Sequence, residues 1–133
     1  MALIGKVPPA RQATLAAVHN AAGELLDRAI ILFFPAPASA TGEDCLEFHC
    51  HGGRAVLDAV LTALSEVDGL RRALAGEFTR RAFENGRIDL NEAEGLADLL
   101  TAETESQRRA AMAMAEGGLS ALVARWQVAL LQL

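Results

Sequence analysis

Apolar and polar residues along the first fifty positions follow a pattern that predicts three strands. Ala13–Val18 and Leu25–Phe34 are apolar segments, and the polar, glycine-containing stretch between them is typical of a hairpin. Pro35 and Pro37 end the second strand, because proline lacks a backbone N–H and restricts its neighbour. A third strand is expected over about Cys45–His51.

The pattern then changes to helical spacing. A helix is expected from Gly52-Gly53 to about Leu64, with apolar residues repeating on one face. Leu70–Leu74 predicts another short strand. Thr79–Glu84 predicts a short helix, which stops at Asn85-Gly86 because these residues tolerate the left-handed exit conformation.

Two later helices begin with capping patterns. Asp89 is followed three residues later by Glu92, and Thr104 by Gln107. After Thr104 the apolar residues recur at alternating steps of three and four, which predicts one long helix with an unpartnered stripe. The stripe consists of Met112, Ala115, Leu119, Leu122, Trp126, Ala129 and Leu133, and two glycines at 117 and 118 weaken its middle. We expect its partner helix to come from another chain or from sequence outside this one, which indicates a fragment.

Composition favours a globular α+β protein with a small mixed sheet and helices. Hydrophobic residues make up 52% and charged residues 22% of the 133 positions. The apolar runs are too short to span a bilayer and no secretory signal is visible, so we expect a cytoplasmic protein without a membrane partner. Cys45 and Cys50 are expected to be free thiols, because alternate faces of one strand would keep them apart.

Charge is unevenly distributed. The net charge of −5 argues weakly against a stand-alone nucleic-acid binder. Five arginines nevertheless fall in a short window: Arg71, Arg72, Arg80, Arg81 and Arg87. Every charged residue from Asp89 to Glu105 is acidic. The arginines are either a solvated surface or a basic mouth for an anionic ligand.

The segment TGEDCLEFHCHGG (residues 41–53) carries the candidate chemistry. In a strand, side chains alternate between the two faces. One face would carry Leu46, Phe48 and Cys50, and the other Cys45, Glu47, His49 and His51. The two histidines could bind a metal with Glu47 or Cys45, but no second motif completes the ligand shell. A nucleophilic Cys50 is not supported, because both histidines would point away from it.

Glu47 is the strongest candidate for binding. A carboxylate in the middle of a strand is costly unless a donor reaches it. It is well suited to grip a flat heterocycle that carries an amino group beside a ring N–H, through two parallel charge-assisted hydrogen bonds. A structural partner such as a nearby arginine is the alternative. Neither Gly-x-x-x-x-Gly-Lys-Ser/Thr nor Gly-x-Gly-x-x-Gly is present, so a nucleoside triphosphate is not expected to bind through a phosphate loop.

Two long runs resemble a known family. FFPAPASATGEDCLEFHCHGG (33–53) and GEFTRRAFENGRIDLNEAEGLADLLTAETESQRRAAM (76–112) resemble the N-terminal domain of the bacterial tRNA-modification GTPases called MnmE or TrmE. The resemblance implies a tetrahydrofolate-binding α+β domain, similar to the glycine-cleavage T-protein, that also forms a homodimer. It implies 5-formyl- or 5,10-methylene-tetrahydrofolate as the one-carbon source. It also implies that, with the flavoprotein MnmG, such proteins install a carboxymethylaminomethyl-type group on the wobble uridine of tRNA.

The resemblance assigns two residues. Glu47 matches the family's pterin-contacting glutamate and Arg87 a basic folate contact; no catalytic or metal role is implied for residues 49–51. It implies a partial folate-binding and dimerisation domain over residues 1–102, followed by the truncated first helix of a helical domain over 103–133. GTP, magnesium and potassium would bind only in the family's GTPase domain, so we do not expect this chain to hydrolyse GTP.

The family's initial strand–helix–strand unit, with its Arg-x-Ser-Gly folate contact, is missing here, so we expect an incomplete folate pocket. One alternative is a structural dimerisation fragment that has lost folate binding. The other is a small protein that binds a metal through Glu47, His49 and His51.

Overall fold

The computed structural model describes residues 3–132 and divides into two compact units, one up to Ala75 and one from Gly76. Each unit is described by itself. The first combines a three-stranded sheet with one helix, and the second consists of four helices. The chain is therefore an α+β protein, as predicted.

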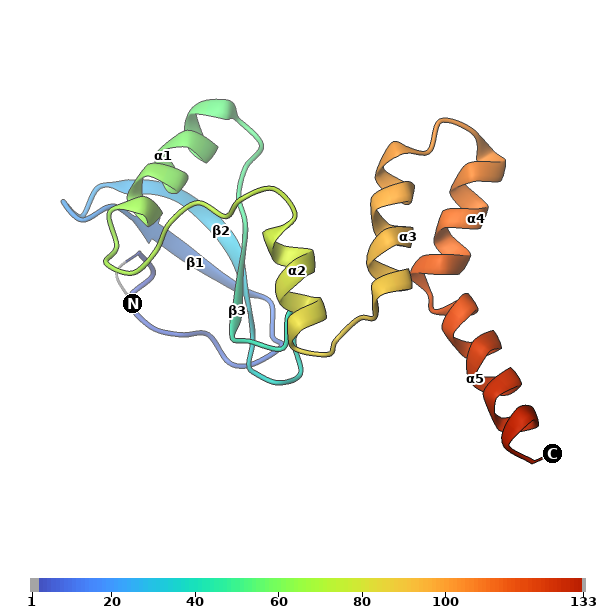
Figure 1. Cartoon of the computed structure of the whole chain (residues 1–133). Coiled ribbons are helices and arrows are strands. Elements are labelled where there is room, and N and C mark those ends of the chain that lie inside the picture. Colours follow the sequence, from blue (N-terminus) through green and yellow to red (C-terminus); the bar gives the residue numbers. More distant parts are fainter. Residues whose placement is uncertain (1–2, 133) are drawn as a thin grey trace. The chain divides into compact units, whose positions relative to one another are not determined.

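The sheet of the first unit contains β1 (Thr14–His19), β2 (Leu25–Phe34) and β3 (Cys45–His49), in that order (Figure 1). Both strand pairs are antiparallel, so the expected mixed sheet is in fact antiparallel. Parallel pairing in the described part of the chain is limited to an isolated bridge between Ala10 and Phe33. The third strand ends at His49, two residues earlier than predicted.

The predicted hairpin between β1 and β2 is confirmed. Its turn is stabilised by the side chain of Asn20, whose Oδ1 accepts hydrogen bonds from the backbone N–H groups of Ala22 at 3.1 Å and Glu24 at 2.9 Å. Asparagine commonly closes turns in this way, because its short side chain reaches the backbone two residues ahead. The hairpin therefore depends on a local interaction that a polar loop sequence can encode.

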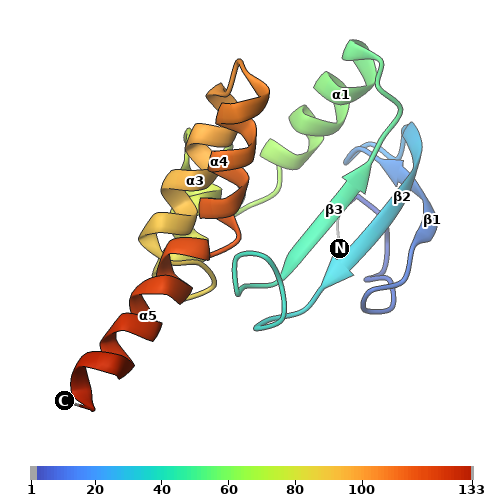
Figure 2. The ribbon, with the colours of Figure 1, turned by 90° about the vertical axis from the view of Figure 1, so that its right-hand side faces the viewer.

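The core of the first unit lies between the sheet and α1 (Arg54–Ser65) (Figure 2). Its buried members come from both layers and from the N-terminal segment: Leu3, Val18, Ala29, Ile31, Val60 and Ala63. Leu46, Phe48 and Cys50 pack against this cluster, while Glu47 and His49 are exposed. The predicted alternation of the third strand is confirmed. One sheet face is buried under the helix and the other is open.

The prediction of a strand at Leu70–Leu74 is wrong. These residues are irregular, and the side chains of Leu70 and Leu74 are 52% and 72% exposed. A strand is stable only where a neighbouring edge supplies hydrogen-bond partners. Residues 70–74 lack such an edge among residues 3–132, so the segment does not form a strand.

The second unit contains α2 (Glu77–Glu84), α3 (Leu90–Thr101), α4 (Glu105–Ala115) and α5 (Gly118–Leu131). Both predicted capping boxes are confirmed. The N–H of Glu92 donates to Asp89 Oδ1 at 2.9 Å, and the N–H of Gln107 donates to Thr104 Oγ1 at 3.2 Å. None of the helices within residues 3–132 has the length and apolar character needed to cross a bilayer.

Helices α3 and α4 pack closely at Gly95. A Cβ atom on Gly95 would lie 2.4 Å from the backbone nitrogen of Ala115 and 2.8 Å from the Cβ of Met114. Real side chains do not approach so closely, so the two backbones can meet only because residue 95 has no side chain. This glycine determines the spacing of the helix pair.

The single helix predicted after Thr104 is instead two helices. Gly117 has a φ of 76°, a left-handed conformation that ends α4, and α5 begins at Gly118. The stripe is therefore interrupted, because glycine adopts this conformation without the steric cost that a side chain would incur. The last position of the stripe, Leu133, lies outside the described residues.

Ser120 connects α5 to the start of α3. Its Oγ donates to the Asp89 carboxylate and accepts from Asn91 Nδ2 at 3.3 Å.

Candidate functional site

Glu47 lies on the open face of the sheet. It is in the middle of β3, and its side chain is 52% exposed. The partner is not an arginine but His49, whose Nε2 lies 3.0 Å from Glu47 Oε2. His49 is the only partner found for this carboxylate within residues 3–132, so Oε1 has none there. The carboxylate therefore faces solvent with acceptor capacity to spare.

The surface beside Glu47 is apolar. In the register of β2 and β3, Leu32 is opposite Glu47 and Ile30 is opposite His49. Leu15 on β1 is in turn opposite Ile30. Leu15 is 69% exposed and Ile30 is 45% exposed. Such a flat apolar surface with one carboxylate at its edge suits a planar ligand that carries N–H donors.

The second histidine of the run has a structural partner. The backbone N–H of His51 donates to Asp27 Oδ2 at 2.9 Å, and its Nδ1 lies 2.7 Å from Asp27 Oδ1. The backbone hydrogen bond from His51, followed by its side-chain hydrogen bond, lowers the pKa of Asp27. Asp27 is not among the site residues predicted from the sequence. The available signal was a carboxylate at position 27, which interrupts the mainly apolar stretch of β2 together with Arg28.

Both cysteines are free thiols, as predicted. Burial, and secondarily the nearby Asp27 carboxylate, raise the pKa of the Cys50 thiol. Because the thiolate is the reactive form, this environment makes Cys50 a poorer nucleophile than an ordinary cysteine. The geometry does not supply the activation that nucleophilic catalysis requires.

The histidines do not assemble into a metal centre within residues 3–132, where no cluster of three or more histidine, cysteine, aspartate or glutamate side chains could hold an ion. His49 pairs with Glu47, and His51 pairs with Asp27. Since Glu47, His49 and His51 do not form the proposed ligand set, the described residues do not support a metal-binding protein.

Arg87 lies in the helical unit, whereas Glu47 lies in the sheet unit. Arg87 follows the end of α2, and its backbone N–H donates to the Ala82 carbonyl at 2.8 Å. Gly86, with a φ of 63°, makes the turn that precedes it. The Arg87 side chain is exposed, so it can contact an anion in solution.

The other four arginines of the predicted cluster belong to two different units. Arg71 and Arg72 belong to the sheet unit, and Arg80 and Arg81 belong to α2. Arg80 lies 3.6 Å from Glu84, an exposed ion pair that contributes little to stability. The five arginines are therefore not one continuous cluster within a single unit.

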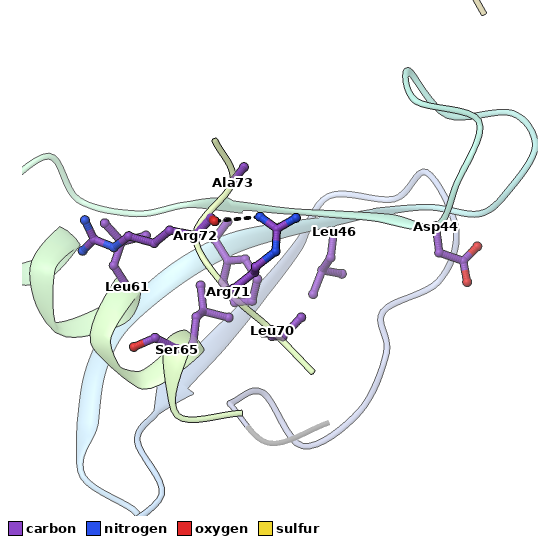
Figure 3. A pocket seen from close by; sticks show the side chains of 10 residues that line it. Asp44, Leu46, Leu61, Ser65, Leu70, Arg71, Arg72 and Ala73 are labelled. Carbon is purple, nitrogen blue, oxygen red and sulfur yellow. Dashed lines mark hydrogen bonds between the residues drawn. The ribbon is translucent and has the colours of Figure 1, made fainter. Parts of the chain in front are cut away.

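A groove of about 640 Å³ lies between β3, α1 and the segment that follows α1 (Figure 3). Its β3 residues alternate with Glu47 along the strand, so the groove is on the other face of the sheet. Leu46 and Phe48 of β3 and Leu61 and Leu64 of α1 form its apolar walls. The segment after α1 closes it with Leu70, Arg71, Arg72 and Ala73. Arg71 Nη1 donates to the Arg72 carbonyl at 3.0 Å, as the dashed line in Figure 3 shows. The groove is not predictable from the sequence, because its walls come from three separate segments.

The fold and the site define an α+β module that presents an exposed carboxylate on an open sheet face and is followed by helices. Residues 2–87 match the family described as "GTP-binding protein TrmE N-terminus", and the chain belongs to this family.

Curated relatives are similar in sequence to this chain along nearly its whole length. A protein of Novosphingobium aromaticivorans named "tRNA modification GTPase MnmE" is 63% identical over 132 residues, which cover 98% of this chain and 30% of that protein. Proteins of the same name from Sphingopyxis alaskensis and Zymomonas mobilis are 62% and 58% identical. These matches cover 99% and 96% of this chain and 32% and 30% of those proteins, respectively. The chain thus spans about a third of the length of the curated relatives it matches.

Proposed function

We propose that this chain is the tetrahydrofolate-binding and homodimerisation module of a tRNA-modification GTPase. The observation that carries the proposal is the Glu47 carboxylate, which stands half-exposed on an open sheet face with Oε1 unpartnered among the described residues. The membership of the chain in the TrmE N-terminus family supports it.

Glu47 would bind the pterin ring of 5-formyl- or 5,10-methylene-tetrahydrofolate. The ring presents an amino group beside a ring N–H, and both donate hydrogen bonds. A carboxylate accepts one on each oxygen, and such charge-assisted pairs are shorter and about twice as strong as neutral ones. The apolar side chain of Leu32, opposite Glu47 on β2, offers the ring a surface against which to lie.

Arg87 would contact the anionic tail of the folate. Tetrahydrofolate ends in a glutamate, so its recognition needs a positive charge, which a guanidinium group supplies together with several N–H donors. The partner protomer of a homodimer would complete the pocket. The exposed apolar residues of the sheet face, Leu15 and Ile30, support a dimer because apolar surface is stabilised when it is covered.

The whole reaction would need more than this chain. In the cytoplasm, with the flavoprotein MnmG, the complete protein would install a carboxymethylaminomethyl-type group on the wobble uridine of tRNA. GTP, magnesium and potassium would bind in the GTPase domain of that complete protein and not in this chain. Within the proposal, residues 1–102 belong to the folate-binding and dimerisation domain, and residues 103–133 begin the helical domain.

Isothermal titration of this chain with 5-formyl-tetrahydrofolate tests the proposal. Glu47→Gln keeps the shape of the side chain, removes its charge and places an N–H₂ against the ligand's own donors. We expect a loss of about 10- to 100-fold in affinity, in the range of a hydrogen bond to a charged group. Glu66→Gln, an exposed change at the end of α1, is the matched control and should bind like the unaltered chain. Equal binding by the Glu47 variant would refute the assignment.

A purely structural dimer is the second candidate, and α5 favours it. No residue of α5 is buried, and Trp126, Val128 and Leu130 are 58%, 56% and 69% exposed. A large exposed apolar surface is commonly an interface. Sedimentation equilibrium combined with the folate titration separates the candidates. A dimer that binds no folate supports the structural role, whereas a dimer that binds it supports the proposed function.

A further inference from the structure

His49 is the residue that holds Glu47. Its Nε2 lies 3.0 Å from Glu47 Oε2. An ionised carboxylate can only accept hydrogen bonds, so the hydrogen on this contact belongs to the imidazole. The two residues are two positions apart on β3, and the period of a strand therefore places both on the same face.

The residues across the strand pair do not compete for this contact. Leu32 and Ile30, opposite Glu47 and His49, have no polar atom in their side chains. An exposed glutamate with apolar cross-strand neighbours would otherwise rotate freely about its side-chain bonds. The contact with His49 reduces that freedom before any ligand arrives.

We propose that His49 is a positioning residue, one that orients the Glu47 carboxylate for a ligand with paired N–H donors. This inference rests on the proposed function. A carboxylate has about four lone-pair sites. His49 occupies one site on Oε2, so Oε1 and the second site on Oε2 are left for the two donors of a pterin edge. His49 therefore fixes the carboxylate without blocking it.

The gain in affinity comes from preorganisation. A ligand that binds an already oriented carboxylate does not lose affinity in ordering it. Removal of His49 would therefore weaken binding, although His49 itself makes no contact with the ligand. Loss of one ordinary hydrogen bond corresponds to a change of about three- to tenfold in affinity. We expect His49→Ala to weaken binding of 5-formyl-tetrahydrofolate by that factor.

A double-mutant cycle tests whether His49 acts through Glu47. The proteins are the unaltered chain, Glu47→Ala, His49→Ala and the double variant, each titrated with 5-formyl-tetrahydrofolate. We expect the double variant to bind as weakly as Glu47→Ala alone, since His49 would have nothing left to orient. His49→Gln should retain most of the affinity, because its amide N–H₂ can donate to the same oxygen. Circular dichroism confirms that each variant is folded.

The outcomes distinguish this inference from the proposed function. If Glu47→Ala weakens binding but His49→Ala does not, or if the two losses add, then His49 has no positioning role and the proposed function stands. Failure of His49→Gln to rescue binding also contradicts the inference. If Glu47→Ala binds as well as the unaltered chain, the proposed function fails and the role of His49 fails with it.

Discussion

The Asp27 carboxylate on β2 accepts two hydrogen bonds from His51, one from the backbone N–H at 2.9 Å and one from Nδ1 at 2.7 Å. The Asp27 side chain is only 7% exposed, whereas that of His51 is 76% exposed. His51 lies between the end of β3 and the start of α1. The pair therefore attaches the connection before α1 to the middle strand of the sheet.

Asp27 should make the stability of the protein depend on acid pH. Its pKa is lowered in the folded state, so its contribution is present above the unfolded pKa of about 3.9 and is lost as pH falls through the folded value. We expect Asp27→Asn to lower the Tm at pH 7 and to reduce the further loss on acidification to pH 3. Thermal unfolding followed by circular dichroism measures both. Asp68→Asn, an exposed change in the same unit, is the control. If acidification lowers the Tm of Asp27→Asn as much as that of the unaltered protein, the prediction is wrong.

Cys50 should react slowly with alkylating reagents. Burial and the Asp27 carboxylate raise its pKa, which lowers the fraction of reactive thiolate near neutral pH. We expect Asp27→Asn to increase the alkylation rate of Cys50 by iodoacetamide several-fold at pH 8. Mass spectrometry of the Cys50 peptide over time gives the rate. No acceleration in the Asp27 variant, or an equal one in Asp68→Asn, would show that the carboxylate does not act on the thiol.

Gly95→Ala should destabilise the helical unit. The added methyl group would meet the backbone of Ala115 at 2.4 Å, and backbone cannot rotate away as a flexible side chain can. Overpacking of this kind costs about 1–3 kcal/mol, which outweighs or cancels the roughly 1 kcal/mol that alanine gains in helix propensity. Urea unfolding gives the free energy change. Gly52→Ala is the matched control, because a Cβ there meets nothing within 4 Å. Equal stability of the two variants would indicate that α3 and α4 can separate without cost.

Glu105 should stabilise the start of α4 at neutral pH. Hydrogen bonds from Arg108, and then from Arg109, lower the pKa of Glu105 to about 2. The contribution of the Glu105 carboxylate to the stability of the helix is therefore complete above the ordinary glutamate pKa of about 4.3. It disappears as pH falls toward 2. We expect Glu105→Gln to reduce helicity at 222 nm slightly at pH 7, and the difference from the unaltered chain to vanish near pH 2. Glu94→Gln, exposed on α3, is the control. A difference that persists at pH 2 would rule out the ion pairs as its cause.

The sequence predicted the parts of the fold that depend on neighbouring residues. Strand alternation placed Glu47 and Phe48 on opposite faces of β3, and both capping boxes formed as expected. The errors lie where a local pattern needs a distant partner or meets an interruption. Leu70–Leu74 was predicted to be a strand but has no pairing edge in the described chain. The apolar stripe after Thr104 continues through Gly117, although the backbone turns there.

The sequence by itself determined the family, the class of fold, the order of the main elements and the face on which Glu47 stands. Only the tertiary structure decided that His49 is the partner of Glu47, that Asp27 accepts hydrogen bonds from a residue 24 positions away, and that Gly95 lies against the backbone of Ala115. Periodicity and capping act over about four residues and can be read along the chain. Contacts between distant segments depend instead on how whole helices and strands pack, which a single sequence does not display.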